Sequence, residues 1–413
     1  SGNYLPHLLP IDQTLHWANP PMGCAEGFPR TDCKGQDPAP YLGPVPMSAH
    51  LHGSHVGPES DGYPEAWWLP AANNIPAGYA TQGTRFDQFD RTNTEPGTAV
   101  FQYPNDQPAA TLWFHDHSLG MTRANGYAGP AGFYFLRSGA ADLPPRTLPS
   151  GPYEIPIVIQ DRSFNQDGSL FYPDTRAFFD AFEGPYVGDA TPSDISPIWN
   201  PEFFGNTIVV NGKTWPYLNV EPRKYRFRIL NGSDSRFFVL ASNNPALKFK
   251  VIGGDGGFLR APVVLDQLLV GPAERFDVIV DFSGFKPGDR IVLQNLGSDA
   301  PFGGFPIAAV DMADPATTGQ VMQFRVVPLK GADRSIVPAF LPRRMPVDRN
   351  PSILATRQVS LNEEASALVC VDVNNLAIPD VFPPDCGGLG VPIAPLAAKL
   401  GTVDLKTNPA MPM

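Results

Sequence analysis

Two short segments, each carrying a His-x-His pair, constrain this sequence more than any other feature. They are residues 49–55 (AHLHGSH) and residues 111–117 (TLWFHDH), which together hold five of the seven His in 413 residues. In a β-strand, residues i and i+2 point to the same face, so each pair presents two imidazoles side by side. If the two strands are neighbours, four imidazoles converge on one point. These four are His50, His52, His115 and His117.

Such a cluster predicts a metal site. Neutral imidazole is a ligand for copper, zinc, iron and nickel, and copper binds most tightly among them at equal availability. The other His are interpreted differently. A lone His is more often a hydrogen-bonded core residue than a ligand, which is our interpretation of His7 and His16. For His55 the choice between a ligand and a loop residue stays open.

Composition favours an all-β protein. The chain has 48 Pro and 39 Gly, yet also 27 Phe, whereas a disordered chain would lack the aromatic residues. Many short apolar runs between turn residues are typical of a β-sandwich or barrel. The net charge of −11 argues against nucleic acid or an anionic membrane surface as partner. No apolar run reaches the roughly 20 residues of a membrane span.

The four Cys form two couples that are close in sequence, Cys24 with Cys33 and Cys370 with Cys386. Each couple brackets a loop rich in Gly and Pro, so we expect two disulfides. Reduced thiols acting as metal ligands are the less favoured alternative, because none of these Cys has C-x-x-C spacing. Disulfides persist in oxidising compartments, which predicts a periplasmic or secreted protein.

Turn-rich segments divide the chain into three predicted β units, at residues 1–140, 153–328 and 356–413. In the second unit a helix is expected only near residues 175–182. The third unit is too short to be stable as an independent β domain.

Several motifs resemble the multicopper oxidase family, specifically its branch of bacterial spore-coat laccases and bilirubin oxidases. The resemblance runs over nearly the whole chain. The matching segments are 50–53, 60–67, 111–117, 122–125 and 127–129, with support from 9–12, 225–232 and 272–277.

The resemblance implies consecutive cupredoxin-like β-barrels, three in the family, with the third incomplete here. It implies copper as cofactor: a mononuclear type 1 copper that takes single electrons from a small aromatic donor, such as a phenol or aromatic amine, and a trinuclear cluster that reduces dioxygen to water. By this resemblance His50 would bind the type 2 copper, and His52, His115 and His117 the type 3 pair. Asp61 would help to supply protons, a task that a carboxylate at the cluster can perform. The alternative for Asp61 is a turn residue that caps its own backbone.

The sequence also departs from the family. The family uses eight cluster His, four of them from the third domain, and a His-Cys-His stretch for the type 1 copper. This sequence has no His after His117. We therefore expect the type 1 copper and the remaining His on a further segment or a companion chain that completes the third domain. The alternative is a degenerate relative, a non-catalytic copper-binding β protein.

A zinc metallohydrolase is the other alternative. His50, His52 and His55 stand at positions that resemble the His-x-His-x-Asp-His motif of metallo-β-lactamase-type enzymes, with Ser54 in place of the Asp. That fold also needs later His ligands and substantial helices, so this interpretation is disfavoured.

Overall fold

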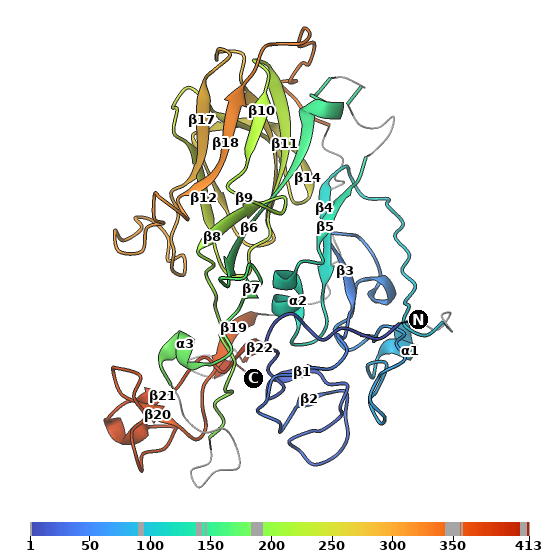
Figure 1. Ribbon diagram of the computed structural model, residues 1–413, viewed down its shortest axis with the longest axis vertical. Coiled ribbons are helices and arrows are strands. Elements are labelled where there is room, and N and C mark those ends of the chain that lie inside the picture. Colours follow the sequence, from blue (N-terminus) through green and yellow to red (C-terminus); the bar gives the residue numbers. More distant parts are fainter. Residues whose placement is uncertain are drawn as a thin grey trace.

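The computed structural model describes residues 2–89, 95–137, 143–144, 147–182, 193–342, 356, 358–404 and 411–412 (Figure 1). Strands joined by long loops dominate, and the described helices are short, which confirms the expected all-β class. Among the described residues, no helix has the length and apolar character needed to cross a membrane.

The N-terminal part of the chain contains two small antiparallel sheets. One pairs β1 with β2, and the other has the order β3-β4-β5. The disulfide between Cys24 and Cys33 confirms the first expected pair and closes the loop between β1 and β2. Trp17 and Trp67 are fully buried at the centre of this part. Its elements are β1 (His16–Ala18), β2 (Asp32–Lys34), β3 (Ala49–His52), a 3₁₀-helix (Pro58–Ser60), α1 (Phe86–Phe89), β4 (Thr111–Asp116), α2 (Thr122–Ala128) and β5 (Gly132–Phe135).

The middle of the chain forms a large β-sandwich. Its eight-stranded sheet runs β14-β13-β16-β11-β6-β8-β9 with β7 beside β6, and its five-stranded sheet runs β10-β18-β17-β12-β15. The elements are a 3₁₀-helix (Gly151–Tyr153), β6 (Glu154–Phe164), β7 (Leu170–Phe171), α3 (Ala177–Asp180), β8 (Thr207–Val210), β9 (Lys213–Thr214), β10 (Tyr217–Val220), β11 (Lys224–Asn231), β12 (Phe238–Ser242), β13 (Phe249–Gly254), β14 (Gly257–Leu265), β15 (Gln267–Val270), β16 (Arg275–Asp281), β17 (Arg290–Asn295) and β18 (Gln320–Val326).

Apolar side chains from both sheets fill the interior of this sandwich. Phe227, Phe238, Phe282 and Phe324 are nearly or fully buried there, together with many Val, Ile and Leu. Residues 225–230 and 276–281 lie in β11 and β16, which pair antiparallel. The helix expected near residues 175–182 is the single turn of α3.

The C-terminal part holds two further sheets, one of order β19-β22-β23 and one that pairs β20 with β21. The disulfide between Cys370 and Cys386 confirms the second expected pair. The elements are β19 (Val359–Glu364), β20 (Cys370–Val371), a 3₁₀-helix (Cys386–Gly388), β21 (Val391–Pro392), β22 (Ala397–Asp404) and β23 (Met411–Pro412).

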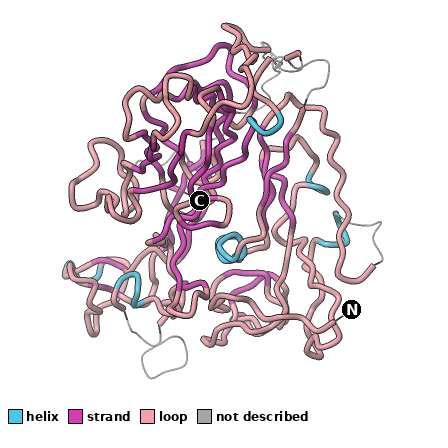
Figure 2. The backbone as a smooth tube through the Cα atoms, turned by 45° about the horizontal axis from the view of Figure 1, so that its top comes forward, coloured by secondary structure: helices cyan, strands magenta, loops and turns pink. Residues whose placement is uncertain are grey.

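Side-chain contacts join the three parts. Arg228 and Arg275 of the sandwich both bond Thr111, the first residue of β4, through its hydroxyl (2.8 Å) and its carbonyl oxygen (3.0 Å). Arg176 donates to the carbonyl of Pro395, which ties the α3 segment to the C-terminal part. Figures 1 and 2 show the large sandwich at one side, with the short strands of both terminal parts beside it. The unit boundaries 1–140, 153–328 and 356–413 stay predictions.

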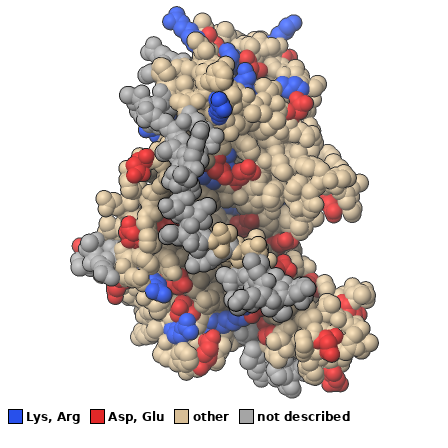
Figure 3. Space-filling view, turned by 180° about the vertical axis from the view of Figure 1, so that it is seen from behind, with Lys and Arg blue, Asp and Glu red and all other residues tan. Residues whose placement is uncertain are grey.

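Among the described residues, charged side chains of both signs are visible on the face seen in Figure 3. There, Asp and Glu are spread over the surface, and Lys and Arg are interspersed with them.

Candidate metal centre

The two His segments are adjacent strands, as the sequence predicted. β3 and β4 pair antiparallel, with His50 directly opposite His115 and His52 opposite Trp113. The backbone N–H of His117, one residue beyond β4, donates to the carbonyl of Ser48 (2.7 Å), which extends the pairing to the second His of the motif. Because side chains alternate along a strand, this register places all four imidazoles on one face.

The four rings form one compact cluster. The ring centroid of His50 lies 5.5 Å from that of His52, 5.2 Å from that of His115 and 5.1 Å from that of His117. Candidate ligand atoms of His50, His52 and His115 all lie within 4.8 Å of one another. Such a spacing lets several imidazoles address the same small region, which is the geometric requirement for a metal site.

Backbone carbonyls fix the tautomers of two rings. His50 Nδ1 donates to the carbonyl oxygen of Asp61 (2.5 Å), and His115 Nδ1 donates to that of Asp116 (2.7 Å). A carbonyl oxygen can only accept, so Nδ1 carries a proton in each ring, and in the neutral form of the ring Nε2 keeps its lone pair. This arrangement, in which one ring nitrogen is anchored and the other is free, is typical of metal-ligating His.

The remaining nitrogens also fit a metal. His52 Nδ1 lies 3.3 Å from His115 Nε2. Two nitrogens that bind one ion at about 2.0–2.1 Å with a near-tetrahedral angle are separated by about this distance. His117 Nδ1 is buried and has no hydrogen-bond partner among the described residues. An unpartnered buried nitrogen is costly, and a metal ion would satisfy it.

The surroundings of His52 and His115 keep these two rings neutral. Burial, aided by the positive charge of Arg275, lowers the pKa of His52 to about 3. Burial also lowers the pKa of His115 to about 4, although the hydrogen bond to the Asp116 carbonyl acts in the opposite direction. Both rings are therefore neutral at pH 7, which is the state that binds a metal.

Asp116 holds the two strands together, a role that the sequence analysis did not assign. Its buried carboxylate accepts hydrogen bonds from the backbone N–H of Ser48 (2.8 Å) and from the hydroxyl and N–H of Ser118 (both 2.9 Å). These bonds join the start of β3 to the end of β4. In the sequence, the position of Asp116 between the two His of one motif was the signal that could have indicated this role.

Arg275 was also not predicted from the sequence. Its contact with β4 joins segments that are distant in the chain.

Asp61 contacts the cluster through both its backbone carbonyl and its carboxylate. Its carbonyl oxygen orients His50, and its carboxylate Oδ1 is 3.4 Å from His50 Nδ1. The carboxylate is 52% exposed, so it contacts both the cluster and solvent. This placement suits a group that passes protons inward, and the role itself remains a prediction.

The other three His stand apart from the cluster. His7 is partly buried and bonded on both ring nitrogens, by Asn125 and by the N–H of Leu9, as interpreted from the sequence. His16 also has a partner, the carbonyl of Asp32, but it is exposed and is not a core residue. His55 is exposed, and its backbone N–H donates to Gln107.

The Cys couples do not offer a second metal site. Cys24 and Cys33 lie close to Glu26, a grouping whose atoms are near enough to hold an ion. Both sulfurs are joined in a disulfide, so neither is a thiolate ligand. Reduced thiols as metal ligands, the less favoured alternative, are therefore excluded at this position.

The sequence of this chain is similar to those of known multicopper oxidases. The multicopper oxidase family model matches residues 189–300. The laccase of Bacillus subtilis strain 168 is 39% identical over 342 residues, covering 82% of this chain and 55% of that protein. A multicopper oxidase of Arabidopsis thaliana is 35% identical over 367 residues, covering 88% of this chain and 52% of that protein.

Solved structures of multicopper oxidases are also similar to this chain. The crystal structure of McoA multicopper oxidase from the hyperthermophile Aquifex aeolicus matches with a TM-score of 0.51 and 26% identity, covering 77% of this chain and 57% of that chain. A variant of the same protein matches with a TM-score of 0.50 and 28% identity, covering 73% of this chain and 55% of that one. The chain thus spans about half the length of the curated relatives that it matches.

Proposed function

Because the chain belongs to the multicopper oxidase family, we propose that it supplies one half of a copper centre that reduces dioxygen to water. The electrons would come from one-electron oxidation of small phenolic or aromatic-amine donors, as in a laccase. The observation that carries this proposal is the cluster of four imidazoles on β3 and β4, in which candidate ligand atoms of His50, His52 and His115 lie close together.

The residues present fit the metal that the family implies. His50 would hold the type 2 copper through Nε2, since its Nδ1 is engaged by the Asp61 carbonyl. His52, His115 and His117 would serve the type 3 pair. Copper in these sites supplies the redox capacity for reducing dioxygen. The part of the protein is to present unprotonated nitrogens at fixed positions, which the burial of His52 and His115 achieves.

Asp61 would supply protons to the site. Reduction of dioxygen to water consumes protons, and a carboxylate that touches both solvent and the cluster can transfer them. Asp61 meets this requirement, with its carboxylate 52% exposed and 3.4 Å from His50 Nδ1. Asp116 has a different task, because its carboxylate is buried and occupied by Ser48 and Ser118.

A further segment or companion chain would provide the type 1 copper and the remaining cluster ligands. Support comes from the β19–β22 sheet, where cross-strand partners share a face. The face with Val359, Leu361 and Leu400 is exposed, at 59%, 90% and 72% respectively. Its opposite face carries Lys399 and Glu364, which pair with each other at 3.0 Å. Among the described residues, this apolar face has no covering layer of the kind that such a face normally has.

The disulfides support a periplasmic or secreted location, because both sequence-local Cys pairs are oxidised.

The zinc metallohydrolase alternative loses support, since His55 is exposed and makes no ring contact with the cluster.

Oxygen uptake with a phenolic donor tests the proposed reaction. The protein as purified, with every polypeptide that accompanies it, is loaded with copper, and donor oxidised is compared with dioxygen consumed. Four donor molecules oxidised per dioxygen, without hydrogen peroxide, would support the proposal. Donor oxidation that accumulates peroxide at two donors per dioxygen, or no copper-dependent uptake, would contradict it.

A further inference from the structure

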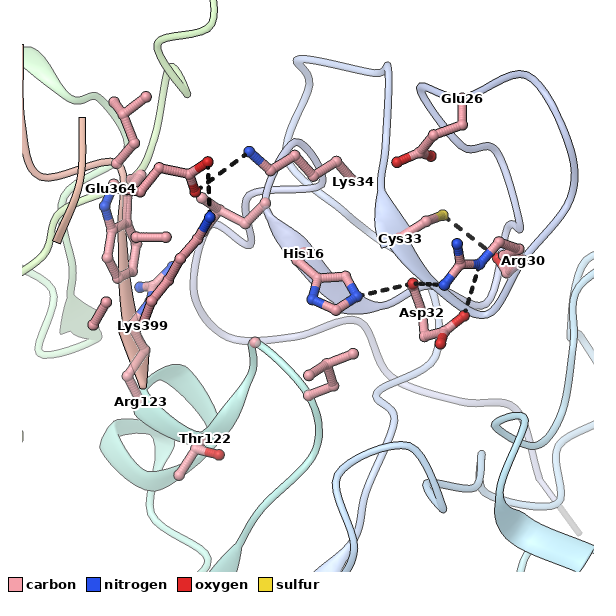
Figure 4. A pocket seen from close by; sticks show the side chains of 17 residues that line it. His16, Glu26, Arg30, Asp32, Cys33, Lys34, Thr122, Arg123, Glu364 and Lys399 are labelled. Carbon is pink, nitrogen blue, oxygen red and sulfur yellow. Dashed lines mark hydrogen bonds and ion pairs between the residues drawn. The ribbon is translucent and has the colours of Figure 1, made fainter. Parts of the chain in front are cut away.

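A cavity lies at the seam between the N-terminal and C-terminal parts, apart from the His cluster (Figure 4). Its volume is about 580 Å³, within the range of sites that hold small molecules. It is bounded by β1, β2 and the start of α2 on one side and by β19 and β22 on the other. Apolar side chains contribute part of the wall, namely those of Leu15, Leu119, Trp199 and Leu396.

The two ends of this cavity differ in the sign of their net charge. Figure 4 shows Lys34, Lys399 and Arg123 on one side, with Glu364 as the carboxylate among them. Glu364 pairs with Lys399 at 3.0 Å and with Lys34 at 3.9 Å, so two ammonium groups share one carboxylate. This end of the cavity has an excess of positive charge, although the protein as a whole carries −11.

The opposite end is acidic. There, Glu26 and Asp32 accompany a single cation, Arg30, which pairs with Asp32 at 3.2 Å. A molecule that complements both ends would place an anionic group near the lysines and a hydrogen-bond donor near the carboxylates.

Arg123 is a cation of the cavity wall whose buried Nε has no hydrogen-bond partner among the described residues. Its guanidinium lies over the ring of Trp199 and donates to the hydroxyl of Tyr172 at 3.0 Å. Among the described residues it has no carboxylate within ion-pair distance. Asp234 acts on it electrostatically, but burial raises the pKa of that carboxyl group to about 7, so Asp234 is only partly charged at neutral pH. Arg is also the side chain best shaped to bind a carboxylate through two parallel hydrogen bonds.

We propose that this cavity is a binding site for a small aromatic carboxylate that carries a polar donor at its far end, such as a hydroxybenzoate. The carboxylate would lie near Arg123, Lys34 and Lys399, the ring against the apolar wall, and the hydroxyl toward Glu26. This site is separate from the copper chemistry and does not depend on the proposed oxidase function.

The proposal is compatible with a covering layer over the C-terminal sheet. Glu364, Ala397 and Lys399, which line the cavity, lie on the face of the β19–β22 sheet opposite Leu361 and Leu400. A segment that covers the apolar face would therefore leave the cavity open.

Calorimetric titration of the 413-residue protein with 4-hydroxybenzoate tests the site, with quenching of Trp fluorescence as a second readout. We expect saturable one-to-one binding with a Kd on the order of 0.1–1 mM, as for other ligands of this size. The neutral analogue 4-hydroxybenzyl alcohol and the cationic analogue tyramine should bind at least about tenfold more weakly, since both lack the carboxylate.

Three variants localise the binding. Arg123→Gln should weaken 4-hydroxybenzoate binding at least about tenfold, and Lys399→Gln should weaken it to a smaller degree. Lys248→Gln is the matched control, because Lys248 pairs with Asp266 on the exposed surface away from the cavity. Circular dichroism checks the fold, and if Arg123→Gln does not fold, Lys399→Gln decides the question.

Equal binding of the neutral or cationic analogue would overturn the proposal. So would wild-type affinity in the cavity variants, or the absence of saturable binding at about 10 mM ligand, well above the expected Kd.

Discussion

His50 and His115 face each other across the β3–β4 ladder, with their ring centroids 5.2 Å apart. This pair sets the geometry of the whole cluster, because the register that joins them also places His52 and His117 on the same face. A slip of one residue would turn one His pair to the opposite face of the sheet. The bonds of Asp116 to Ser48 and Ser118 fix the register at the end of the ladder.

Removing a cluster imidazole should remove copper. We expect His115→Ala and His117→Ala each to lower copper affinity by more than the factor of about 10–100 that is typical of changes to groups around the ligands. Competition with a chelator measures the affinity. His55→Ala is the control, since its side chain is exposed and outside the cluster. Wild-type affinity in either cluster variant would show that the ring is not a ligand.

Asp61→Asn should keep copper but slow reoxidation by dioxygen. The substitution preserves the backbone carbonyl that orients His50 and removes only the ionisable group. General acid groups contribute about 10²–10⁴-fold to proton-transfer steps, and we expect a loss near the lower end of that range. Stopped-flow reoxidation of the reduced enzyme measures it, with Glu59→Gln, an exposed acidic neighbour, as control. An unchanged reoxidation rate would show that Asp61 acts only as a turn residue.

The copper-free protein should lose stability as the pH falls below about 6.5. His52 and His115 have folded-state pKa values of about 3 and about 4, below the ordinary value of 6.5. The unfolded chain therefore takes up protons first, and each ring contributes up to about 1.4 kcal/mol per pH unit between 6.5 and its folded-state pKa. Urea unfolding from pH 7.5 to 4.5 measures this dependence. The His52→Gln/His115→Gln variant should show a shallower slope, and an unchanged slope would refute this origin.

The ion-pair network beside β4 should be important for stability. Asp277 binds Arg226 through both carboxylate oxygens, at 2.8 and 2.6 Å, and Arg228 at 3.1 Å, and all three residues are buried. Asp277→Ala removes a carboxylate from two buried guanidiniums, both of which also pair with Glu154, and should cost about 3–5 kcal/mol in the free energy of unfolding. Asp266→Ala, which breaks the exposed pair with Lys248, should cost less than about 1 kcal/mol. Similar losses in guanidinium unfolding of both variants would contradict this ranking.

Local patterns were sufficient to predict much of this molecule. The period-two spacing of the His-x-His pairs predicted shared faces, and the pairing of β3 with β4 confirmed that four imidazoles meet. The nearness of each Cys couple in sequence predicted both disulfides correctly. Many short apolar runs between turn residues predicted the all-β class.

Features that depend on contacts between distant segments were not predictable in this way. Arg275 reaches β4 from a strand 164 positions later in the chain, and the cavity joins β2 to β22. The short helix α2 was also missed: it has a Gly at its fifth position, Gly126, and its buried side packs into the N-terminal core. Tertiary packing overrides local helix propensity at such places.

The most direct test of the central claim combines denaturing intact-mass analysis with a copper count on the same purified material. We predict that a further polypeptide bearing a His-Cys-His segment accompanies this sequence, or extends it beyond 44.7 kDa, and that copper approaches four per complex. A sample that contains only the 44.7 kDa chain and binds no copper would contradict the claim that these four imidazoles form half of a copper centre.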